Sequence, residues 1–304
     1  MIVELGGFLL GLVLLVFGAD RAVTAAGGLA LYWGLSPFFI GVTVISIGTS
    51  VPEMVTSITG AYYGAGDLVV GNIVGSETAQ ITLGIAVVAL IAPIVAWRRE
   101  ILTYGSAMIL AMVIMLLTLS DGTIGRSEGV LMMLAYVQFV YILYTSEGGS
   151  EIAAELDEGL QPREAAPWIL GGLALVVFGS QVMVTNGTAL ARIAGVSEYL
   201  IGLLTGLGTT FPEIAIAGMA AARGRQGISI GSLLGSNITD PVFSLGIGAV
   251  FFDLTVASPD AVWRSTTYML GVSVFVLGLL YWKEGISRRL AVVCLLLYLP
   301  SFVV

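Results

Sequence analysis

Histidine is absent from this sequence of 304 residues, and cysteine and lysine occur once each, as Cys294 and Lys283. A single cysteine excludes an internal disulfide. Without histidine or a second thiol, the nitrogen and sulfur ligand sets of zinc sites are excluded too. Any metal ion bound by this chain must therefore be held by oxygen atoms.

Charged residues are scarce as well. They make up 11% of the chain, against 57% hydrophobic residues and a mean hydropathy of +1.00. That leaves too few polar side chains to cover a water-soluble globule of this length, so the composition predicts a polytopic membrane protein. The first residues include Glu4 where a cleavable signal would carry basic residues, so we expect the first helix to be retained.

Long apolar runs follow one another along the whole chain, and their number predicts ten transmembrane helices in an all-α membrane protein. The runs cover approximately residues 2–33, 36–63, 67–92, 100–119, 123–145, 166–193, 197–221, 227–252, 260–282 and 285–304. The widest gap between them, 146–165, is acidic and contains glycine and proline. It is too polar for lipid and is interpreted as a linker between two halves.

The two halves, residues 1–145 and 166–304, repeat each other. The segment GLVLLVFG at 11–18 matches GLALVVFG at 172–179, and GNIVGS at 71–76 matches GSLLGS at 231–236. Five helices per half bring the second copy into the membrane from the opposite side. The sequence therefore predicts two inverted five-helix repeats, an organisation common in transporters.

The repeated motif at the centre of each half is GTSVPE at 48–53 and GTTFPE at 208–213. Inside a helix, proline lacks a donor and its ring clashes with the carbonyl four residues earlier, so each helix must bend or break there. In a bilayer the freed carbonyls are tolerated only where they line a cavity or water.

Each motif ends in an acid, Glu53 or Glu213. A carboxylate costs about 2.5–3.5 kcal/mol or more inside a bilayer, which favours a cation beside it. The hydroxyls of Thr49, Ser50, Thr209 and Thr210 and the loosened carbonyls complete a ligand set typical of hard cations.

Basic residues predict the orientation, because cytoplasmic loops carry the Lys/Arg excess. With the N-terminus outside, eight bases fall in cytoplasmic loops and three outside: Arg98, Arg99, Arg163, Arg223, Arg225, Lys283, Arg288 and Arg289 against Arg126, Arg192 and Arg264. We therefore expect both termini to be extracellular and the linker to be cytoplasmic.

The duplicated GTSVPE and GTTFPE motifs, each followed by a G-x-x-x-G-S segment, resemble the two alpha repeats of prokaryotic sodium/calcium exchangers in the calcium/cation antiporter superfamily. The resemblance covers both halves and implies exchange of external Na+ for internal Ca2+ by alternating access. It implies that Glu53, Glu213 and the carbonyls of Thr49 and Thr209 coordinate Ca2+. It assigns sodium sites to Ser50, Ser76, Thr210, Ser236 and the carbonyls of Ser46 and Gly206, with Asp240 and Gln80 at the centre.

Elementary coordination chemistry agrees in outline with that assignment. Ca2+ takes 6–8 oxygens, and two carboxylates supply its charge. Na+ carries half that charge, so hydroxyls and carbonyls with a shared carboxylate suffice, and competition for shared ligands would couple the two fluxes. We expect a plasma-membrane protein that works as a monomer, contacts lipid, binds no nucleic acid and needs no cofactor beyond the transported ions.

Several alternatives stay open. A proton/calcium antiporter, or one for another divalent cation, would use the same carboxylates. A passive channel would also explain intramembrane acids, although an inverted repeat around one central cluster favours alternating access. An intramembrane hydrolase lacks a base, because histidine is absent and Lys283 lies near a helix end. Pro52 and Pro212 could kink helices for packing alone, and Ser76 and Ser236 could serve close helix packing.

Two positions depart from the family pattern. Gln80 replaces the Asn or Asp of similar exchangers, and Glu77 adds an acid one position after Ser76, where the second half carries Asn237. Glu77 either faces the cavity, where it would exchange protons as cations come and go, or faces a neighbouring helix as a hydrogen-bonded carboxyl. Asp240 lies four residues after Ser236, which places both on one helical face.

Overall fold

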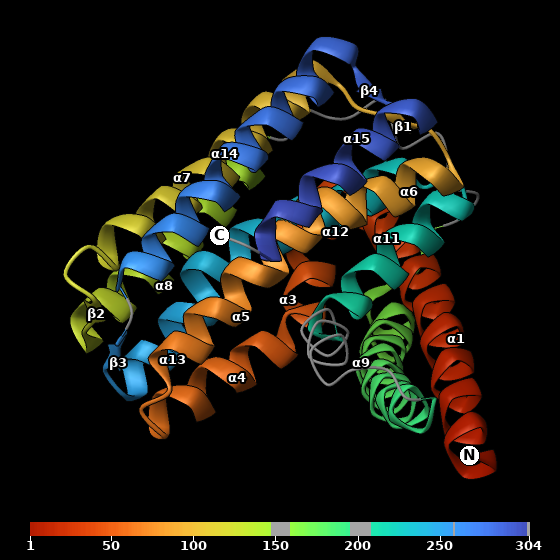
Figure 1. Cartoon of the computed structure of the whole chain (residues 1–304). Helices are drawn as coiled ribbons and strands as arrows, with labels where there is room; N and C mark the ends of the chain where they lie inside the picture. The colour runs from red at the N-terminus through yellow and green to blue at the C-terminus, as the bar shows by residue number, and fades with distance from the viewer. Residues whose placement is uncertain (147–158, 195–207, 258, 303–304) are drawn as a thin grey trace.

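The computed structural model describes residues 1–146, 159–194, 208–257 and 259–302. The first half begins with one long helix and continues through shorter, broken ones (Figure 1). Its elements are α1 Ile2–Trp33, α2 Pro37–Ile40, η1 Gly41–Ile45, α3 Ser46–Thr49, α4 Val51–Tyr62, α5 Gly66–Ala79, η2 Gln80–Gly84, α6 Ile85–Ile91, β1 Ile94–Val95, α7 Arg98–Thr118, β2 Thr123–Ile124 and α8 Arg126–Ser146.

The second half has the same order of long, broken and long helices. Its described elements are α9 Pro162–Ile193, η4 Gly208–Thr210, α11 Phe211–Ala222, α12 Gln226–Thr239, η5 Asp240–Ser244, α13 Leu245–Phe251, β3 Leu254–Thr255, α14 Pro259–Lys283, β4 Gly285–Ile286, α15 Arg288–Tyr298 and η6 Leu299–Phe302. Helix α9 begins at Pro162 rather than at the expected 166, because proline is well suited to the first turn of a helix. The linker expected at 146–165 falls largely on 147–158, outside the described residues.

Six helices are long and apolar enough to cross a membrane, or seven if the bent pair Pro37–Thr49 and Val51–Tyr62 forms one span, among the residues that the structure describes. One of the six, Gly66–Ile91, runs through α5, η2 and α6. The expected count of ten is thus not reached by this criterion. Residues 197–207 of the expected seventh segment lie outside the described ranges, and α15 has only 11 residues.

The first proline motif lies at a break between helices. Helix α3 ends at Thr49, α4 begins at Val51, and the helical segments Pro37–Thr49 and Val51–Tyr62 are bent by 45°. In the second half the short 3-10 turn η4 leads into α11, with Pro212 in the first turn of that helix. The expected interruption at Pro52 is confirmed, and in both halves the motif glutamate lies in the first turn of the helix that contains the motif proline.

Three π-helical turns interrupt the helices near these breaks: η1, η2 and η5. The last two begin at Gln80 and Asp240, which occupy equivalent places in the two halves. A π turn widens the backbone by one residue and is frequent at functional sites. Both halves therefore distort the same helix at the same place.

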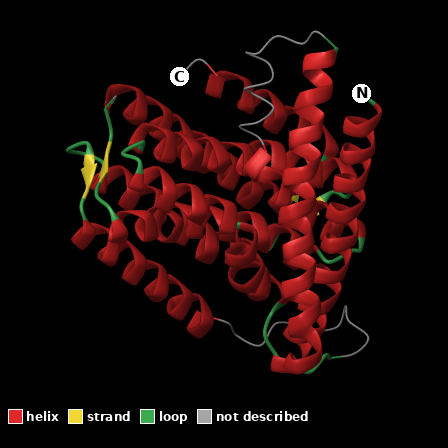
Figure 2. Cartoon of the chain, turned by 90° about the horizontal axis from the view of Figure 1, so that it is seen from below, coloured by secondary structure: helices red, strands yellow, loops and turns green. Residues whose placement is uncertain are grey.

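Helices α1 and α9 form an antiparallel pair at one side of the molecule (Figures 1 and 2). They approach closely at glycines: a Cβ on Gly11 would lie 2.7 Å from the Gly179 carbonyl oxygen, and one on Gly18 would lie 2.6 Å from that of Gly172. These are the residues of the repeated GLVLLVFG and GLALVVFG segments. The repeat thus serves close backbone packing, as small residues do between helices in membranes.

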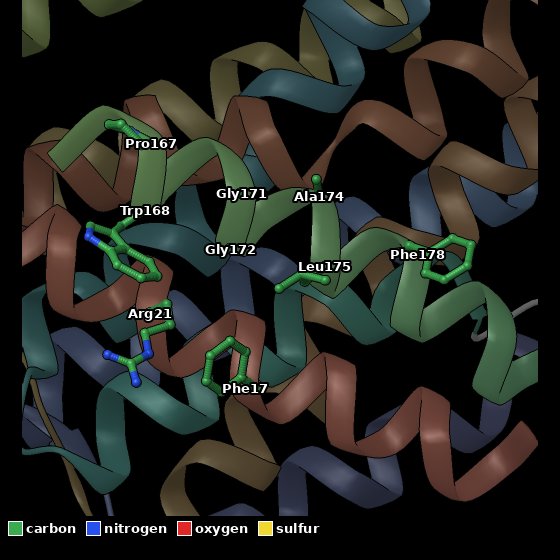
Figure 3. Close-up of a pocket in the computed structure, with 9 residues that line it drawn as sticks. All are labelled: Phe17, Arg21, Pro167, Trp168, Gly171, Gly172, Ala174, Leu175 and Phe178. Carbon is green, nitrogen blue, oxygen red and sulfur yellow. The ribbon is translucent and has the colours of Figure 1, made fainter. Parts of the chain in front are cut away.

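Aromatic side chains border a groove of about 470 Å³ on the outer side of this helix pair (Figure 3). The Arg21 guanidinium lies 5.0 Å from the Phe17 ring centroid and 5.4 Å from that of Trp168. The neighbouring Asp20 pairs with Arg223 rather than with Arg21. Among the described residues that line this groove none is acidic, so the carboxylates of the two motifs are not part of it.

Two short antiparallel strand pairs connect the halves at opposite ends of the helix stack (Figure 1). Strand β1 pairs with β4, and β2 pairs with β3. Strands β1 and β3 occupy equivalent places in the two halves, and so do β2 and β4. The two pairings are therefore reciprocal, as expected of two copies related by an approximate two-fold axis.

Candidate cation site

The two motif glutamates are fully buried at the start of their helices. Glu53 and Glu213 each have an exposed fraction of 0%, and each lies in the first turn, of α4 and α11 respectively. The N-terminus of a helix carries a partial positive charge and favours an anion there. The Glu53 charge lies close enough to act on the Glu213 carboxyl, so the two halves bring these acids into one buried region.

The threonines of the motifs cross between the halves. Thr209 lies beside the Glu53 carboxyl, and Thr49 lies beside the Glu213 carboxyl. The Thr49 hydroxyl also donates to the carbonyl oxygens of Ile45 at 3.3 Å and Ser46 at 3.2 Å. Each acid is therefore accompanied by a hydroxyl from the other half, and the motifs form one cluster rather than two.

A chain of hydrogen bonds runs from Glu53 into the second half. The Ser76 hydroxyl donates to Glu53 Oε1 at 3.2 Å, and Gln80 Nε2 donates to Ser76 Oγ at 3.1 Å. Asn237 Nδ2 donates to Gln80 Oε1 at 2.6 Å. The Thr210 hydroxyl reaches Ser76 Oγ at 3.5 Å. These hydrogen bonds link α5, η2, η4 and α12 to Glu53 at the start of α4.

Asp240 is the first residue of the π turn η5 and is also fully buried. Its Oδ1 accepts a hydrogen bond from the Ser244 hydroxyl at 2.8 Å. Ser50 and Gln80 lie beside the same carboxyl. The structure thus brings Asp240 and Gln80 together, the two residues that the family resemblance places at the centre of a cation site.

Many oxygens of this cluster have no hydrogen-bond partner among the described residues. They are Ser50 Oγ, Glu53 Oε2, both carboxyl oxygens of Glu77 and of Glu213, Ser236 Oγ and Asp240 Oδ2. Burying such groups without partners is costly, and a coordinated cation removes that cost. Within the described residues no ion pair involves any of these acids, so no basic side chain there offsets their charge.

Carboxylates alone do not form the site. Within the described residues, no group of three or more His, Cys, Asp or Glu side chains is arranged to hold a metal ion. A cation here would thus take at most two carboxylates at once and complete its shell with hydroxyl, amide or carbonyl oxygens. That is the mixed oxygen set expected for hard cations.

Three predicted site residues remain: Ser46, Glu77 and Gly206. The Ser46 hydroxyl donates to the Val42 carbonyl at 2.5 Å and lies 3.0 Å from the Thr239 hydroxyl, at the edge of the cluster. Glu77 is fully buried and feels the charges of the other three acids. Its carboxyl makes no hydrogen bond to a neighbouring helix within the described chain. Gly206 lies outside the described residues.

Sequence reasoning assigned no role to two amides that the structure places beside the site. Asn237 bonds to Gln80 across the halves, and Asn72 Oδ1 accepts from the Thr209 hydroxyl at 3.4 Å. Asn72 lies in the repeated GNIVGS segment and Asn237 directly follows the matching GSLLGS. Their position in or next to the repeated segments was the sequence feature that could have marked them as site residues.

A cavity of about 720 Å³ lies beside the helix breaks. Its lining, among the described residues, includes Gly48, Pro52, Gly208, Thr209 and Pro212. The residues that interrupt the helices therefore also border open space next to Thr209, which itself lies beside Glu53.

Broken apolar helices around buried, unpaired carboxylates define the class as a membrane transport protein. The model of the sodium/calcium exchanger protein family matches residues 3–145 and 165–304. The chain belongs to the sodium/calcium exchanger family.

Relatives and solved structures agree over nearly the whole chain. The inner membrane protein YrbG of Escherichia coli is 33% identical, with 91% of this chain and 88% of that protein covered. The sodium/calcium exchanger MaX1 of Methanosarcina acetivorans is 27% identical, with 97% and 96% covered. A structure of the sodium-calcium exchanger NCX_Mj, soaked with zero Na+ and Ca2+, superimposes with a TM-score of 0.83 at 26% identity, covering 100% of this chain and 99% of that one.

Proposed function

We propose that this chain exchanges extracellular Na+ for intracellular Ca2+ by alternating access. The observation that carries the proposal is the full burial of Glu53 and Glu213, one from each half, in the first turns of α4 and α11 and with carboxyl oxygens free to coordinate. Two carboxylates match the charge of one Ca2+. The name of the similar exchanger MaX1 and the structures of NCX_Mj support the same choice of ions.

In this proposal Glu53 and Glu213 hold Ca2+ together with the carbonyls of Thr49 and Thr209. Sodium ions use the hydroxyls of Ser50, Ser76, Thr210 and Ser236 and the carbonyls of Ser46 and Gly206, with Asp240 and Gln80 at the centre. Sodium ions at these positions also use the Glu53 and Glu213 carboxylates. Na+ and Ca2+ therefore compete for the same two side chains. Competition for these shared ligands would couple the two ion fluxes.

The proposed architecture is ten transmembrane helices in two inverted five-helix repeats, 1–145 and 166–304. The reciprocal strand pairs support it, because a two-fold axis in the membrane plane maps β1–β4 onto β3–β2. The crossed contacts of Thr209 with Glu53 and of Thr49 with Glu213 follow the same symmetry. Each half would then present its break to the site from the opposite side.

The proposed location is the plasma membrane, with both termini outside, the 146–165 linker in the cytoplasm and a monomer as the working unit. The basic-residue bias supports this orientation. The strand pairs support the ten-crossing topology on which this orientation is built, because β1 and β4 then fall on one side of the membrane and β2 and β3 on the other.

Ion-gradient dependence in liposomes tests the function. Purified protein is reconstituted with Na+ inside, and 45Ca2+ uptake is followed after dilution into sodium-free buffer. We expect uptake that needs the outward Na+ gradient and vanishes when an ionophore dissipates it. A parallel arm supplies a pH gradient without Na+. Uptake driven by that gradient alone would contradict sodium coupling and favour proton/calcium exchange.

A further inference from the structure

The groove on the outer side of α1 and α9 has a charged end and an apolar end. Arg21 lies beside Trp168 at one end, and Phe178 lies at the other (Figure 3). Trp168 and Phe178 are ten residues apart, so the groove follows α9 for about 15 Å. Its volume of about 470 Å³ falls within the range of ligand pockets, about 300–1,000 Å³.

Two adjacent glycines of α9 give the groove its depth. A Cβ on Gly172 would lie 2.7 Å from the Gly18 carbonyl oxygen, so this position holds α9 close to α1. A Cβ on Gly171 would meet no atom of another element within 4 Å, so this position faces open space. A larger side chain at residue 171 would therefore fill the groove without disturbing the helix contact.

Positive charge is in excess at the Arg21 end. Asp20 pairs with Arg223, and within the described residues no ion pair involves Arg21. The Arg225 Nη1 donates to two nearby carbonyls of α1 at 2.6 and 3.1 Å. These three guanidinium groups outnumber the one carboxylate that pairs with them, so an anionic group is favoured there and an ammonium group is disfavoured.

This charged end lies level with a membrane surface. Arg223 and Arg225 flank Gly224, whose φ of 72° marks the turn between α11 and α12. Turns between membrane helices lie outside the hydrocarbon core, and arginine side chains near them extend toward the headgroups. In the orientation proposed above this is the cytoplasmic surface, where anionic lipids are enriched.

We propose that the groove binds one anionic phospholipid, with its phosphate at Arg21 and an acyl chain along α9 toward Phe178. The groove has the same order of polarity as a phospholipid, whose headgroup lies at the surface and whose chains point toward the midplane. Trp168 stands at the level where tryptophan is enriched in membrane proteins. A free phosphate would meet only the charged end and leave the apolar end uncovered. The proposal is independent of which ions the protein carries.

Native mass spectrometry of the purified full-length protein in detergent tests this proposal. Delipidated protein is titrated with phosphatidylglycerol and, in parallel, with phosphatidylcholine of the same acyl chains. We expect the first phosphatidylglycerol to bind about fivefold more tightly than phosphatidylcholine, and Arg21→Gln to remove that preference, since one basic side chain contributes about this factor at an anionic lipid surface. The matched control Arg289→Gln removes another exposed arginine, in the first turn of α15 and outside the groove, and should bind lipid like wild type.

A second pair of variants tests the apolar part of the groove. Gly171→Leu should weaken phosphatidylglycerol binding by about fivefold or more, because its side chain occupies the space of the acyl chain. The matched control is Gly271→Leu on α14, where a Cβ also meets no atom of another element within 4 Å, and it should bind like wild type. Arg21→Lys keeps the charge and should keep the preference for phosphatidylglycerol, which separates loss of charge from misfolding of Arg21→Gln.

Equal phosphatidylglycerol binding by wild type and Arg21→Gln would overturn the proposal, and so would wild-type binding by Gly171→Leu. Equal affinity of wild type for the two lipids would mean ordinary apolar contact with the bilayer. Displacement of the lipid by glycerol phosphate would mean that only the charged end binds. A dimer that persists at saturating lipid and is lost in Gly171→Leu would mean that a second copy of the chain occupies the groove. Each of these three results would also contradict a bound phospholipid.

Discussion

The serines that follow the two G-x-x-x-G segments behave differently in the two halves. Ser76 is saturated: it donates to Glu53 and lies within reach of Gln80 and Thr210. Its counterpart Ser236 has no hydrogen-bond partner among the described residues, and neither carboxyl oxygen of Glu213 has one. The same motif therefore serves as an internal connection in the first half and as a set of open ligands in the second. Sequence symmetry does not enforce equal roles.

The largest expected contrast between the halves is their orientation in the membrane. In a Cys294→Ser background, Asp121→Cys lies in the β2 turn and Glu284→Cys lies before β4, both exposed. We expect a membrane-impermeant maleimide to label the first on intact cells and the second only after permeabilisation. Labelling of both from outside would contradict the inverted repeat.

Removing either central charge should almost eliminate Ca2+ binding, because each glutamate supplies half of the charge that offsets the ion. Truncating one member of a buried charged contact costs about 2–5 kcal/mol, so Glu53→Gln and Glu213→Gln should each weaken 45Ca2+ binding by about 30-fold or more. The fold should persist, since losing a buried charge lowers the cost of insertion. Wild-type affinity in either variant would remove that residue from the site.

Replacing Ser76 and replacing Ser236 should change the stability of the cation-free protein by different amounts. Ser76→Ala breaks a bonded network and should lower the free energy of unfolding by about 1–3 kcal/mol, whereas Ser236→Ala removes a hydroxyl with no described partner and should leave it nearly unchanged. Thermal unfolding in sodium-free and calcium-free detergent solution measures the difference. Equal destabilisation would mean that the two serines have the same structural role.

Local chemistry predicted the helix breaks and the acids. Pro52 forces the break before α4 whatever surrounds it, and duplication of the motif was enough to expect Glu53 and Glu213 in one place. The start of α9 at Pro162 was missed because the segment before 166 is polar, although proline suits a first helical turn.

Contacts between distant segments could not be read from the sequence. The Asn237–Gln80 bond joins residues 157 positions apart, and its geometry depends on how α5 and α12 pack. The π turn at Gln80 likewise carries no composition signal, because its segment contains no proline, whereas Pro241 follows Asp240 in the second half.

Displacement of bound 45Ca2+ by Na+ from the purified protein tests most directly whether both ions share Glu53 and Glu213. If the ligands are shared, rising Na+ should release all bound Ca2+ with a dependence steeper than one to one, since more than one Na+ takes the place of each Ca2+. Replacement of Na+ by choline at equal ionic strength should release none. Ca2+ that stays bound at saturating Na+ would contradict shared ligands, and with them the proposed basis of exchange.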